Sequence, residues 1–488
     1  MRFKKVLLIY PHYPEGHYSG GRNTRSPIGL GIIGEMLKLS GVDYEVVDLG
    51  LGYDMNYLNQ HIKDYKPDAV GISMMTFMYN YMYSILGELK ESYGNIKIIA
   101  GGPHVTAWKT KVLEQCPAID FGISREGEFT IKELCEEKEL PTIKGLIYRE
   151  GNIILFNGER ELIDNLDSIP FPKYEKFELD KYVHEIRINS SRGCPYKCIF
   201  CQTCSILGKK WRGRSAANIA DEIEFWHEKG YRDFTFVDDN FTLNKKRIYQ
   251  LCDEMENRHL DNIHLGAGGV RVDLVDRDLL KRMREVGFYY IAFGVESGNN
   301  EILKVLKKSY TIEQAEQAVR DAVELGFNVK LYFLVGSPYE TFQNIQDSIN
   351  FALKYPIWDV NFSNLTPIPE TELIDWVRKE GELLTQPEIY LNEYAAFKRI
   401  PFFVAPGMSL KERKYALRVT EKVGIEIRKR WKEKNAYKKI SQLGIPGKLI
   451  AKIYVSTFVS YLFQHNRLLR HIKELILKKV ESLRRNKQ

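Results

Sequence analysis

The sequence predicts an α/β protein with three parts: an N-terminal doubly wound parallel domain of the Rossmann type, a partial barrel of six β/α repeats, and a C-terminal helical extension. Three observations predict this arrangement. The chain has 488 residues, which is enough for two or three domains. Strand-length apolar runs alternate with helical segments in two separate series. The last part of the chain breaks this rhythm and is strongly basic.

The first domain is expected over residues 1–140. Strands are predicted over 4–11, 43–50, 67–76, 96–106 and 119–128, and helices over 27–41, 79–91 and 129–137. Loops after the carboxyl ends of such strands bind ligands. Here they carry Ser73, Thr76, Gly101, Gly102, Pro103, His104, Glu126 and Gly127. Glycine and serine at these ends allow a bulky ligand to approach the backbone, although ordinary glycine turns explain the same residues.

A linker is expected over residues 141–183. It contains a predicted small hairpin over 145–156, with its turn at Glu150-Gly151-Asn152. Ile169-Pro170-Phe171-Pro172 then predicts a rigid, extended connector into the next domain.

The partial barrel is expected over residues 184–400. Its six strands are predicted over 184–190, 231–242, 264–275, 288–298, 328–338 and 358–371, and its helices over 214–230, 245–258, 276–287, 309–326 and 343–356. Six repeats are fewer than the eight of a closed barrel. We therefore expect an open side through which a large substrate, or a cofactor held by the first domain, reaches the centre.

Three cysteines follow the first barrel strand with the spacing C-x3-C-x2-C: Cys194, Cys198 and Cys201. Iron–sulfur clusters held by protein alone usually take four thiolates, so three would leave one iron of a 4Fe-4S cluster open to an outside ligand. Gly193 and Pro195 would curl the loop around the cluster, and Phe200 would shield one face of it. The alternatives are three unremarkable cysteines or a structural zinc site, but zinc prefers four ligands with paired C-x2-C spacing.

Cys204 lies three residues beyond the third cysteine and does not fit this spacing. We expect it outside the cluster. It is either a spare buried thiol, as free cysteines often are, or a redox or radical-quenching group near the substrate, which makes it a candidate catalytic residue.

The cysteine spacing and the barrel around it resemble the radical S-adenosylmethionine (SAM) superfamily. In that superfamily SAM chelates the open iron and is cleaved to a 5′-deoxyadenosyl radical. Active groups of such barrels lie at the carboxyl ends of strands. The resemblance implies SAM contacts by Phe200, by Asp238 or Asp239 with the SAM ammonium group, by Arg271 with its carboxylate, by Glu296 with its ribose or amine, and by Gly336 and Pro338 with its adenine.

The first domain carries P-I-G-L-G, D-A-V-G-I-S, I-I-A-G-G-P-H-V-T and G-x-x-R-E-G-E. Together these motifs resemble the cobalamin-binding domain that precedes many radical SAM cores, and the likeness runs over roughly residues 4–400. It implies that the eight loop residues above bind cobalamin. The Asp-x-His-x-x-Gly signature of a cobalt ligand is absent. A variant, Glu15-Gly16-His17-Tyr18-Ser19-Gly20, leaves open whether His17 ligates cobalt or the match is chance.

This resemblance implies a class B radical SAM enzyme that methylates an unactivated carbon or other inert centre of a small-molecule or lipid-like substrate. Related enzymes cyclise or rearrange their substrates, and a cobalamin or redox sensor is a further alternative. Sulfur insertion is least favoured, because Cys116 and Cys135 are too few for the extra cluster that such enzymes carry. An electron donor such as flavodoxin or ferredoxin is expected as a partner, and a reduced cluster implies an anaerobic setting.

The remaining composition predicts a cytoplasmic protein. The chain enters a strand directly, without a signal peptide. Its seven cysteines cluster as a metal site does, rather than as a disulfide framework. No apolar run reaches the ~18–20 residues that would cross a bilayer.

The C-terminal extension is expected over residues 401–488, with a helix over 408–434, an interruption at 444–447 and a short apolar segment at 449–463. Between 430 and 488, fifteen Lys or Arg residues stand against three Asp or Glu. Such a segment suits peripheral membrane contact, but a helical cap on the barrel explains the same pattern. Nucleic acid binding is not expected, because no recognition fold accompanies the charge.

Overall fold

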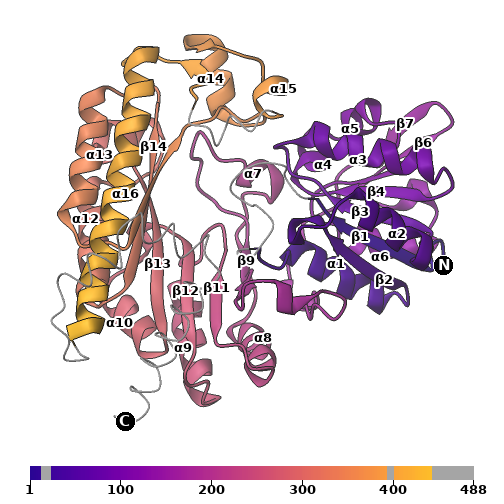
Figure 1. Cartoon of the computed structure of the whole chain (residues 1–488), viewed down its shortest axis with the longest axis horizontal. Helices are drawn as coiled ribbons and strands as arrows, with labels where there is room; N and C mark the ends of the chain where they lie inside the picture. Colours follow the sequence, from indigo (N-terminus) through magenta and orange to yellow (C-terminus); the bar gives the residue numbers. More distant parts are fainter. Residues whose placement is uncertain (12–23, 393–399, 442–488) are drawn as a thin grey trace, which may run out of the picture.

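The computed structural model describes residues 1–11, 24–392 and 400–441, with side chains described up to residue 435. It contains two largely parallel sheets, one in the N-terminal part of the chain and one in the middle part, which lie side by side (Figure 1). The α/β class and the two parallel units that the sequence predicts are confirmed. His17 and the segment beyond residue 441 lie outside the described residues.

The first sheet has the strand order β2-β1-β3-β4-β5-β6-β7. Its parallel strands are β1 (Lys5–Tyr10), β2 (Asp43–Asp48), β3 (Ala69–Ser73), β4 (Lys97–Gly101) and β5 (Phe121–Ile123). The hairpin expected over residues 145–156 forms β6 (Leu146–Glu150) and β7 (Ile153–Phe156), which pair antiparallel beyond β5. The hairpin therefore extends the first sheet, and the residues after it lead to the barrel.

Helices cover both faces of the first sheet. They are α1 (Ile28–Leu39), α2 (Met55–Tyr65), α3 (Tyr79–Ser92), α4 (Pro103–Trp108), α5 (Thr110–Gln115) and α6 (Glu128–Cys135). Alternate residues of β1 point to opposite faces: Val6 and Leu8 belong to the core that α1 and α6 cover, and Leu7 and Ile9 to the core under the other helices. The sheet is thus doubly wound.

Helix α2 was not among the predicted elements. Asp54 begins it, because its side chain accepts a hydrogen bond from the Tyr57 N–H at 2.9 Å. Leu58, Ile62 and Tyr65 then recur at helical spacing on its buried face. Both signals are present in the sequence, but they are weak beside the polar residues around them.

The second sheet has six parallel strands in the order β15-β14-β13-β12-β11-β8. They are β8 (Ile186–Ile188), β11 (Asp233–Phe236), β12 (His264–Val270), β13 (Phe288–Glu296), β14 (Asn328–Val335) and β15 (Asp359–Asn364). On its outer side lie α8 (Ala216–Glu228), α9 (Lys245–Asn257), α10 (Arg277–Glu285), α12 (Ile312–Glu324) and α13 (Phe342–Lys354) (Figure 1). Strands β8 and β15 remain the two edges, so the barrel is open between them.

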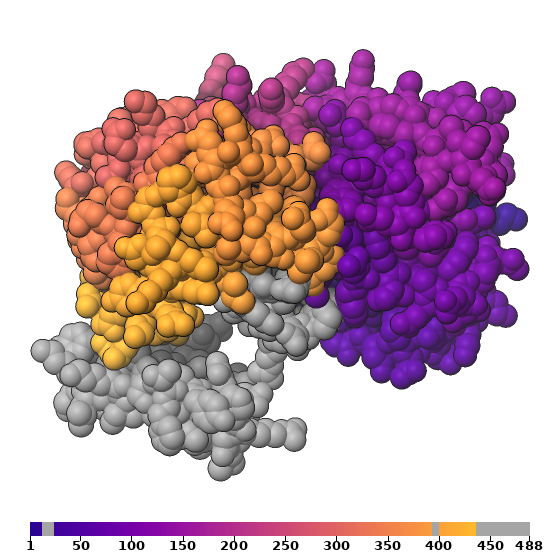
Figure 2. Space-filling model, turned by 90° about the horizontal axis from the view of Figure 1, so that it is seen from above, coloured from indigo at the N-terminus to yellow at the C-terminus, as the bar shows by residue number. Residues whose placement is uncertain are grey.

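The chain after the barrel contacts both the first domain and the barrel's edge strand β15. It forms α14 (Glu372–Glu380), β16 (Glu382–Leu383), α15 (Pro387–Tyr390), β17 (Phe403–Val404) and α16 (Leu410–Ser441). Leu391, directly after α15, contacts the first domain, because its carbonyl accepts from the Met78 N–H at 2.7 Å. In Figure 2 the orange part of the chain lies against the indigo part. Helix α16 packs along the edge strand β15. No helix among the described residues combines the length and apolarity that crossing a bilayer requires.

Candidate functional site

The three predicted cluster cysteines lie on a loop between β8 and α8 that is closed at its base. Short strands β9 (Ser191–Arg192) and β10 (Arg212–Gly213) pair antiparallel and bring the two ends of the loop together. Gly193 has a φ of +84°, and a Cβ there would lie 2.5 Å from the Lys210 carbonyl oxygen. Only glycine fits that turn. Cys194 and Cys198 are partly buried, and Cys201 is exposed.

The role of Cys194, Cys198 and Cys201 as cluster ligands stays a prediction. The described residues contain no group of three His, Cys, Asp or Glu side chains spaced to hold one ion. Ligands of a single zinc would converge within about 2.3 Å of it. Burial raises the pKa of the Cys194 and Cys198 thiols, and the Asn240 amide lies 4.0 Å from the Cys194 sulfur.

Cys204 lies on α7 (Thr203–Ile206), beside the cysteine loop. Its thiol donates to the carbonyl oxygens of Cys194 at 3.3 Å and Tyr196 at 3.1 Å. These contacts tie α7 to the loop backbone, which is a packing role. A catalytic role for Cys204 stays a prediction.

A buried ion pair lies against the same loop. Glu296 ends β13 with a φ of +63°, and the Lys308 Nζ atom is 3.1 Å from its carboxylate. The same Nζ lies 5.8 Å from the centre of the Phe200 ring. Burial alone would lower the pKa of Lys308, but the Glu296 carboxylate raises it above its ordinary value. Lys308 was not predicted, because no local motif marks it.

Arg271 positions the loop from the other side. Its guanidinium lies 3.4 Å from the centre of the Tyr196 ring. Two further bonds, both 3.0 Å, hold it to the Asp273 carboxylate. Arg271 is therefore rigid and close to the cysteine loop, where its predicted contact with the SAM carboxylate stays a prediction.

The two neighbouring aspartates after β11 differ in their surroundings. Asp238 is buried and accepts from the backbone N–H groups of Ser190 at 2.6 Å and Ser191 at 3.1 Å. Asp239 accepts from the Gly193 N–H at 3.1 Å and from the Thr203 hydroxyl at 3.2 Å. Asp238 thus supports the strand end, and Asp239 faces the cysteine loop. Contact of either with SAM stays a prediction.

The turn after β14 is supported from the C-terminal helix. Gly336 has a φ of +95°, and a Cβ there would lie 2.1 Å from Cζ of Arg413. The Glu340 carboxylate accepts from the N–H groups of Gly336 at 2.6 Å and Ser337 at 3.1 Å. Burial raises the pKa of Glu340 to about 7 and lowers that of Arg413 to about 10. Pro338 is buried in the same turn.

A cavity of about 360 Å³, here the first cavity, opens at the carboxyl ends of the first sheet. Of the predicted cobalamin residues, those that line it are Ser73, Gly101, Gly102, Glu126 and Gly127. A Cβ on Gly29 of α1 would meet nothing within 4 Å, and one on Gly101 nothing nearer than 3.9 Å. These glycines leave space that side chains would fill, and the isoleucines around them make the walls apolar. The cavity is too small to enclose a cofactor as large as cobalamin, but its glycine edge and apolar walls fit part of one.

His104 lies away from the first cavity. It is buried in an aromatic cluster, with its Nε2 atom 2.8 Å from the Tyr83 hydroxyl and its ring stacked 4.5 Å from that of Tyr79. Burial lowers its pKa to about 3, so the ring is neutral at ordinary pH. Pro103 begins the helix that carries it, and Thr76, in the loop after β3, is also buried. These three residues are not among those that line the cavity.

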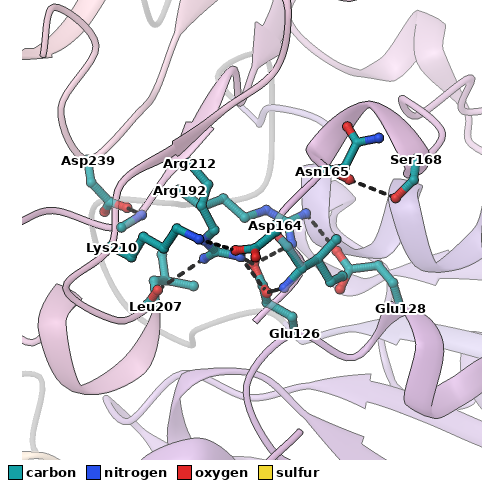
Figure 3. Close-up of polar contacts among 12 residues, drawn as sticks. Glu126, Glu128, Asp164, Asn165, Ser168, Arg192, Leu207, Lys210, Arg212 and Asp239 are labelled. Atoms are coloured by element: carbon teal, nitrogen blue, oxygen red, sulfur yellow. Dashed lines mark hydrogen bonds and ion pairs between the residues drawn. The ribbon is translucent and has the colours of Figure 1, made fainter. Parts of the chain in front are cut away.

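The loop after β5 is bound to the base of the cysteine loop by buried ion pairs (Figure 3). Glu126 accepts from Arg212 at 2.7 Å and from Arg192 at 3.0 Å, and Glu128 accepts from Arg192 at 2.6 Å. Burial alone would raise the pKa of Glu126, but the hydrogen bond from Arg212 and the charge of Arg192 lower it. The network joins the first cavity to the cysteine loop, and its arginines were not predicted.

A second cavity, of about 1200 Å³, lies along the open edge of the barrel. Phe77, in the loop after β3, lines it from the first domain, and Phe200 lines it from the cysteine loop. Residues of β14, β15 and α16 form most of the remaining wall, and residues of the segments 365–368 and 400–401 complete it. The cavity therefore reaches the cysteine loop at Phe200, a predicted SAM contact, and the loop after β3 at Phe77.

Two family models match the chain. The B12 binding domain matches residues 22–135, and the Radical SAM superfamily matches residues 188–352. An uncharacterized methyltransferase of Pyrococcus horikoshii is 33% identical over 396 residues, which cover 79% of this chain and 85% of the relative. An anaerobic magnesium-protoporphyrin IX monomethyl ester cyclase of Cereibacter sphaeroides is 27% identical over 400 residues, covering 78% of this chain and 64% of the cyclase.

Two solved structures share the fold. The radical SAM methyltransferase TsrM of Kitasatospora setae, with tryptophan substrate and a SAM analogue bound, superposes with a TM-score of 0.67 at 18% identity, covering 85% of this chain and 89% of that one. The cobalamin-dependent SAM radical enzyme OxsB, with aqua-cobalamin and SAM bound, gives 0.71 at 17% identity, covering 98% and 75%. At these identities the likeness supports the fold alone.

Proposed function

The chain belongs to the cobalamin-binding radical SAM family, and on that premise we propose that it methylates an unactivated carbon, or another inert centre, of a small-molecule or lipid-like substrate. The family consists of enzymes whose cofactors are a 4Fe-4S cluster, SAM and cobalamin. When bound, these cofactors supply the radical that removes a hydrogen atom and the methyl group that replaces it. The second cavity carries the proposal, because a substrate there would touch both the Phe77 side and the Phe200 side.

The chain's own residues would bind and orient the reactants. We propose that Cys194, Cys198 and Cys201 hold the cluster, and that the Glu296–Lys308 pair and Arg271 position SAM beside it. Both groups are buried and held by neighbours, so their geometry changes little when a ligand binds. The first cavity would take part of the cobalamin, and the Glu126–Arg212 pair would fix its distance from the cysteine loop.

A second candidate, cyclisation or rearrangement without net methyl transfer, is favoured by the cyclase among the relatives. The two reactions leave different products from SAM. Methyl transfer yields S-adenosylhomocysteine together with 5′-deoxyadenosine, whereas cyclisation yields 5′-deoxyadenosine without S-adenosylhomocysteine. The cytoplasmic and anaerobic setting and an electron donor such as flavodoxin or ferredoxin stay predictions.

The test is anaerobic turnover of the protein reconstituted with iron, sulfide and hydroxocobalamin, using SAM labelled with deuterium in its methyl group. Metabolite and lipid extracts serve as sources of substrate. With the wild type we expect 5′-deoxyadenosine, S-adenosylhomocysteine and a product that carries the labelled methyl group. With Cys198→Ala we expect none of the three. Deoxyadenosine without S-adenosylhomocysteine would favour cyclisation. Failure to retain corrinoid and to cleave SAM under strong reductant would refute both candidates.

A further inference from the structure

The wall of the second cavity that α16 and β14 form is positively charged. Four cations line the cavity: Lys330 of β14 and Lys414, Arg418 and Arg428 of α16. Two carboxylates, Asp359 and Glu421, also line it. The lining therefore carries an excess of positive charge, and an excess of one sign inside a concave surface attracts ligands of the other sign.

The carboxylates do not neutralise all four cations. Asp359 is shared, since Lys330 approaches it at 3.0 Å and Arg428 at 2.8 Å. Glu421 has a partner of its own. In contrast, neither the Lys414 side chain nor the Arg418 side chain forms a hydrogen bond or an ion pair with a described residue.

Lys414 and Arg418 are four positions apart on one helix, so their side chains lie on the same face. Two like charges at this spacing repel each other, and both line the cavity. An anion between them would remove this repulsion and form charge-assisted hydrogen bonds with both.

The cavity lining also includes apolar side chains on the cysteine loop and on the loop after β3. Phe200 and Phe77 line it there, and Leu334 of β14 and Ile368 add aliphatic surface. A ligand that fills the cavity would thus meet cations along α16 and apolar side chains toward the cysteine loop.

We propose that the substrate is an amphiphilic anion whose carboxylate or phosphate binds Lys414 and Arg418, while its apolar part carries the reacting carbon toward Phe200 and Phe77. That the occupant is the substrate rests on the proposed function. That the cavity binds an amphiphilic anion rests on the lining alone.

The test measures binding by calorimetry to the reconstituted full-length enzyme below the micellar concentration of each probe. The probes are octyl phosphate, octanoate and neutral octanol, which share a chain and differ in the head group. The variant is K414Q/R418Q. Its control is K411Q/K422Q, which removes the same charge from exposed positions of the same helix that do not line the cavity.

We expect octyl phosphate and octanoate to bind the wild type at least about tenfold more tightly than octanol, which corresponds to about 1.4 kcal/mol. K414Q/R418Q should lose this advantage and K411Q/K422Q should keep it. Equal binding of octanol and the anions, or an unchanged advantage in K414Q/R418Q, would overturn the inference. An advantage lost equally in the control would also overturn it, because it would place the anion elsewhere on the basic surface.

The same preparations report separately on the proposed function. SAM cleavage and corrinoid retention are measured on each variant before the probes are added. If the wild type fails these two assays but binds the anions through Lys414 and Arg418, the proposed reaction is wrong and the anion site stands.

Discussion

Arg212 donates two hydrogen bonds to the carboxylate of Glu126, at 2.8 and 2.7 Å, across the junction between the first domain and the cysteine loop. The side chains are 1% and 3% exposed, respectively. The Ile163 N–H donates to the same carboxylate at 2.7 Å, and the Ile163 carbonyl accepts from Arg212 at 2.8 Å. Both carboxylate oxygens of Glu126 are thus hydrogen-bonded, whereas Nε of Arg212 is buried without a partner among the described residues. The pair connects the lining of the first cavity to the base of the loop that carries the cysteines.

We expect Glu126→Ala to lower the free energy of unfolding by about 3–5 kcal/mol, because it leaves Arg212 charged and buried without a carboxylate. Urea denaturation followed by circular dichroism measures this. Lys210→Ala is the matched control: the Lys210–Asp164 pair belongs to the same region, but its side chains are 67% and 72% exposed. Its loss should change the free energy of unfolding far less than Glu126→Ala does, because solvent screens an exposed pair. Equal effects of the two changes would contradict the importance of burial here.

Alanine in place of Cys194, Cys198 or Cys201 should each abolish cluster assembly and SAM cleavage, because two thiolates cannot hold the cluster. Cys204→Ala should leave the iron content unchanged, since its thiol donates to backbone carbonyls of the loop. Iron and sulfide analysis, with Mössbauer spectroscopy, checks all four variants. Loss of iron from Cys204→Ala would show that the ligand assignment is wrong.

Gly29→Leu should weaken corrinoid retention by at least about tenfold, since the side chain would occupy the first cavity. Gly87→Leu is a matched control, because Gly87 is also a helical glycine whose Cβ would meet nothing within 4 Å, but it does not line the cavity. Absorbance of corrinoid after desalting measures both. Equal retention by the two variants would exclude the first cavity as a cobalamin site.

The cobalt of bound cobalamin is expected to lack a nitrogen ligand from the protein. Electron paramagnetic resonance of the Co(II) state should therefore show no nitrogen hyperfine splitting that depends on His17. A splitting that is present in the wild type and lost in His17→Ala would instead identify His17 as the ligand.

The turn at Gly336 should make stability depend on pH through Glu340. Burial raises the pKa of this carboxyl from its ordinary value near 4.5 to about 7, so the folded state holds a proton that the unfolded chain releases. This contribution is complete below about pH 4.5 and is lost as pH rises through about 7, by up to about 3 kcal/mol. Glu340→Gln keeps an oxygen for the N–H groups of Gly336 and Ser337 and cannot ionise.

Thermal unfolding of the wild type and Glu340→Gln from pH 5 to 8 checks this. The wild type should lose stability relative to the variant as pH increases. Parallel curves over this range would show that Glu340 keeps the same protonation state in the folded and unfolded chains.

The local sequence pattern alone was enough to predict the two series of strands and helices and the cysteine loop. The buried runs of β1 and β14 and the helix spacing of α12 reflect the geometry of a few neighbouring residues, so a short stretch of sequence contains the information. The spacing of Cys194, Cys198 and Cys201 is equally local, and with Gly193 it defines a loop that closes on itself. Helix α2 was missed because its cap and apolar stripe stand among polar residues.

Only the tertiary structure decided which distant side chains meet. Glu126 and Arg212 are 86 positions apart, and Lys308 reaches Glu296 and Phe200 without any motif of its own. Arg413 of α16 lies against the turn that holds Glu340, and its charge lowers the pKa of that carboxyl. The sequence predicts a hairpin at β6 and β7, but a hairpin in a linker would have the same pattern. Only the structure shows that it extends the first sheet. Local conformation depends on neighbouring residues, whereas buried charge pairs and cavities depend on how whole elements pack. The second cavity, and the Lys414 and Arg418 side chains that have no ion pair with a described residue, therefore became visible only once the C-terminal helix lay along β15.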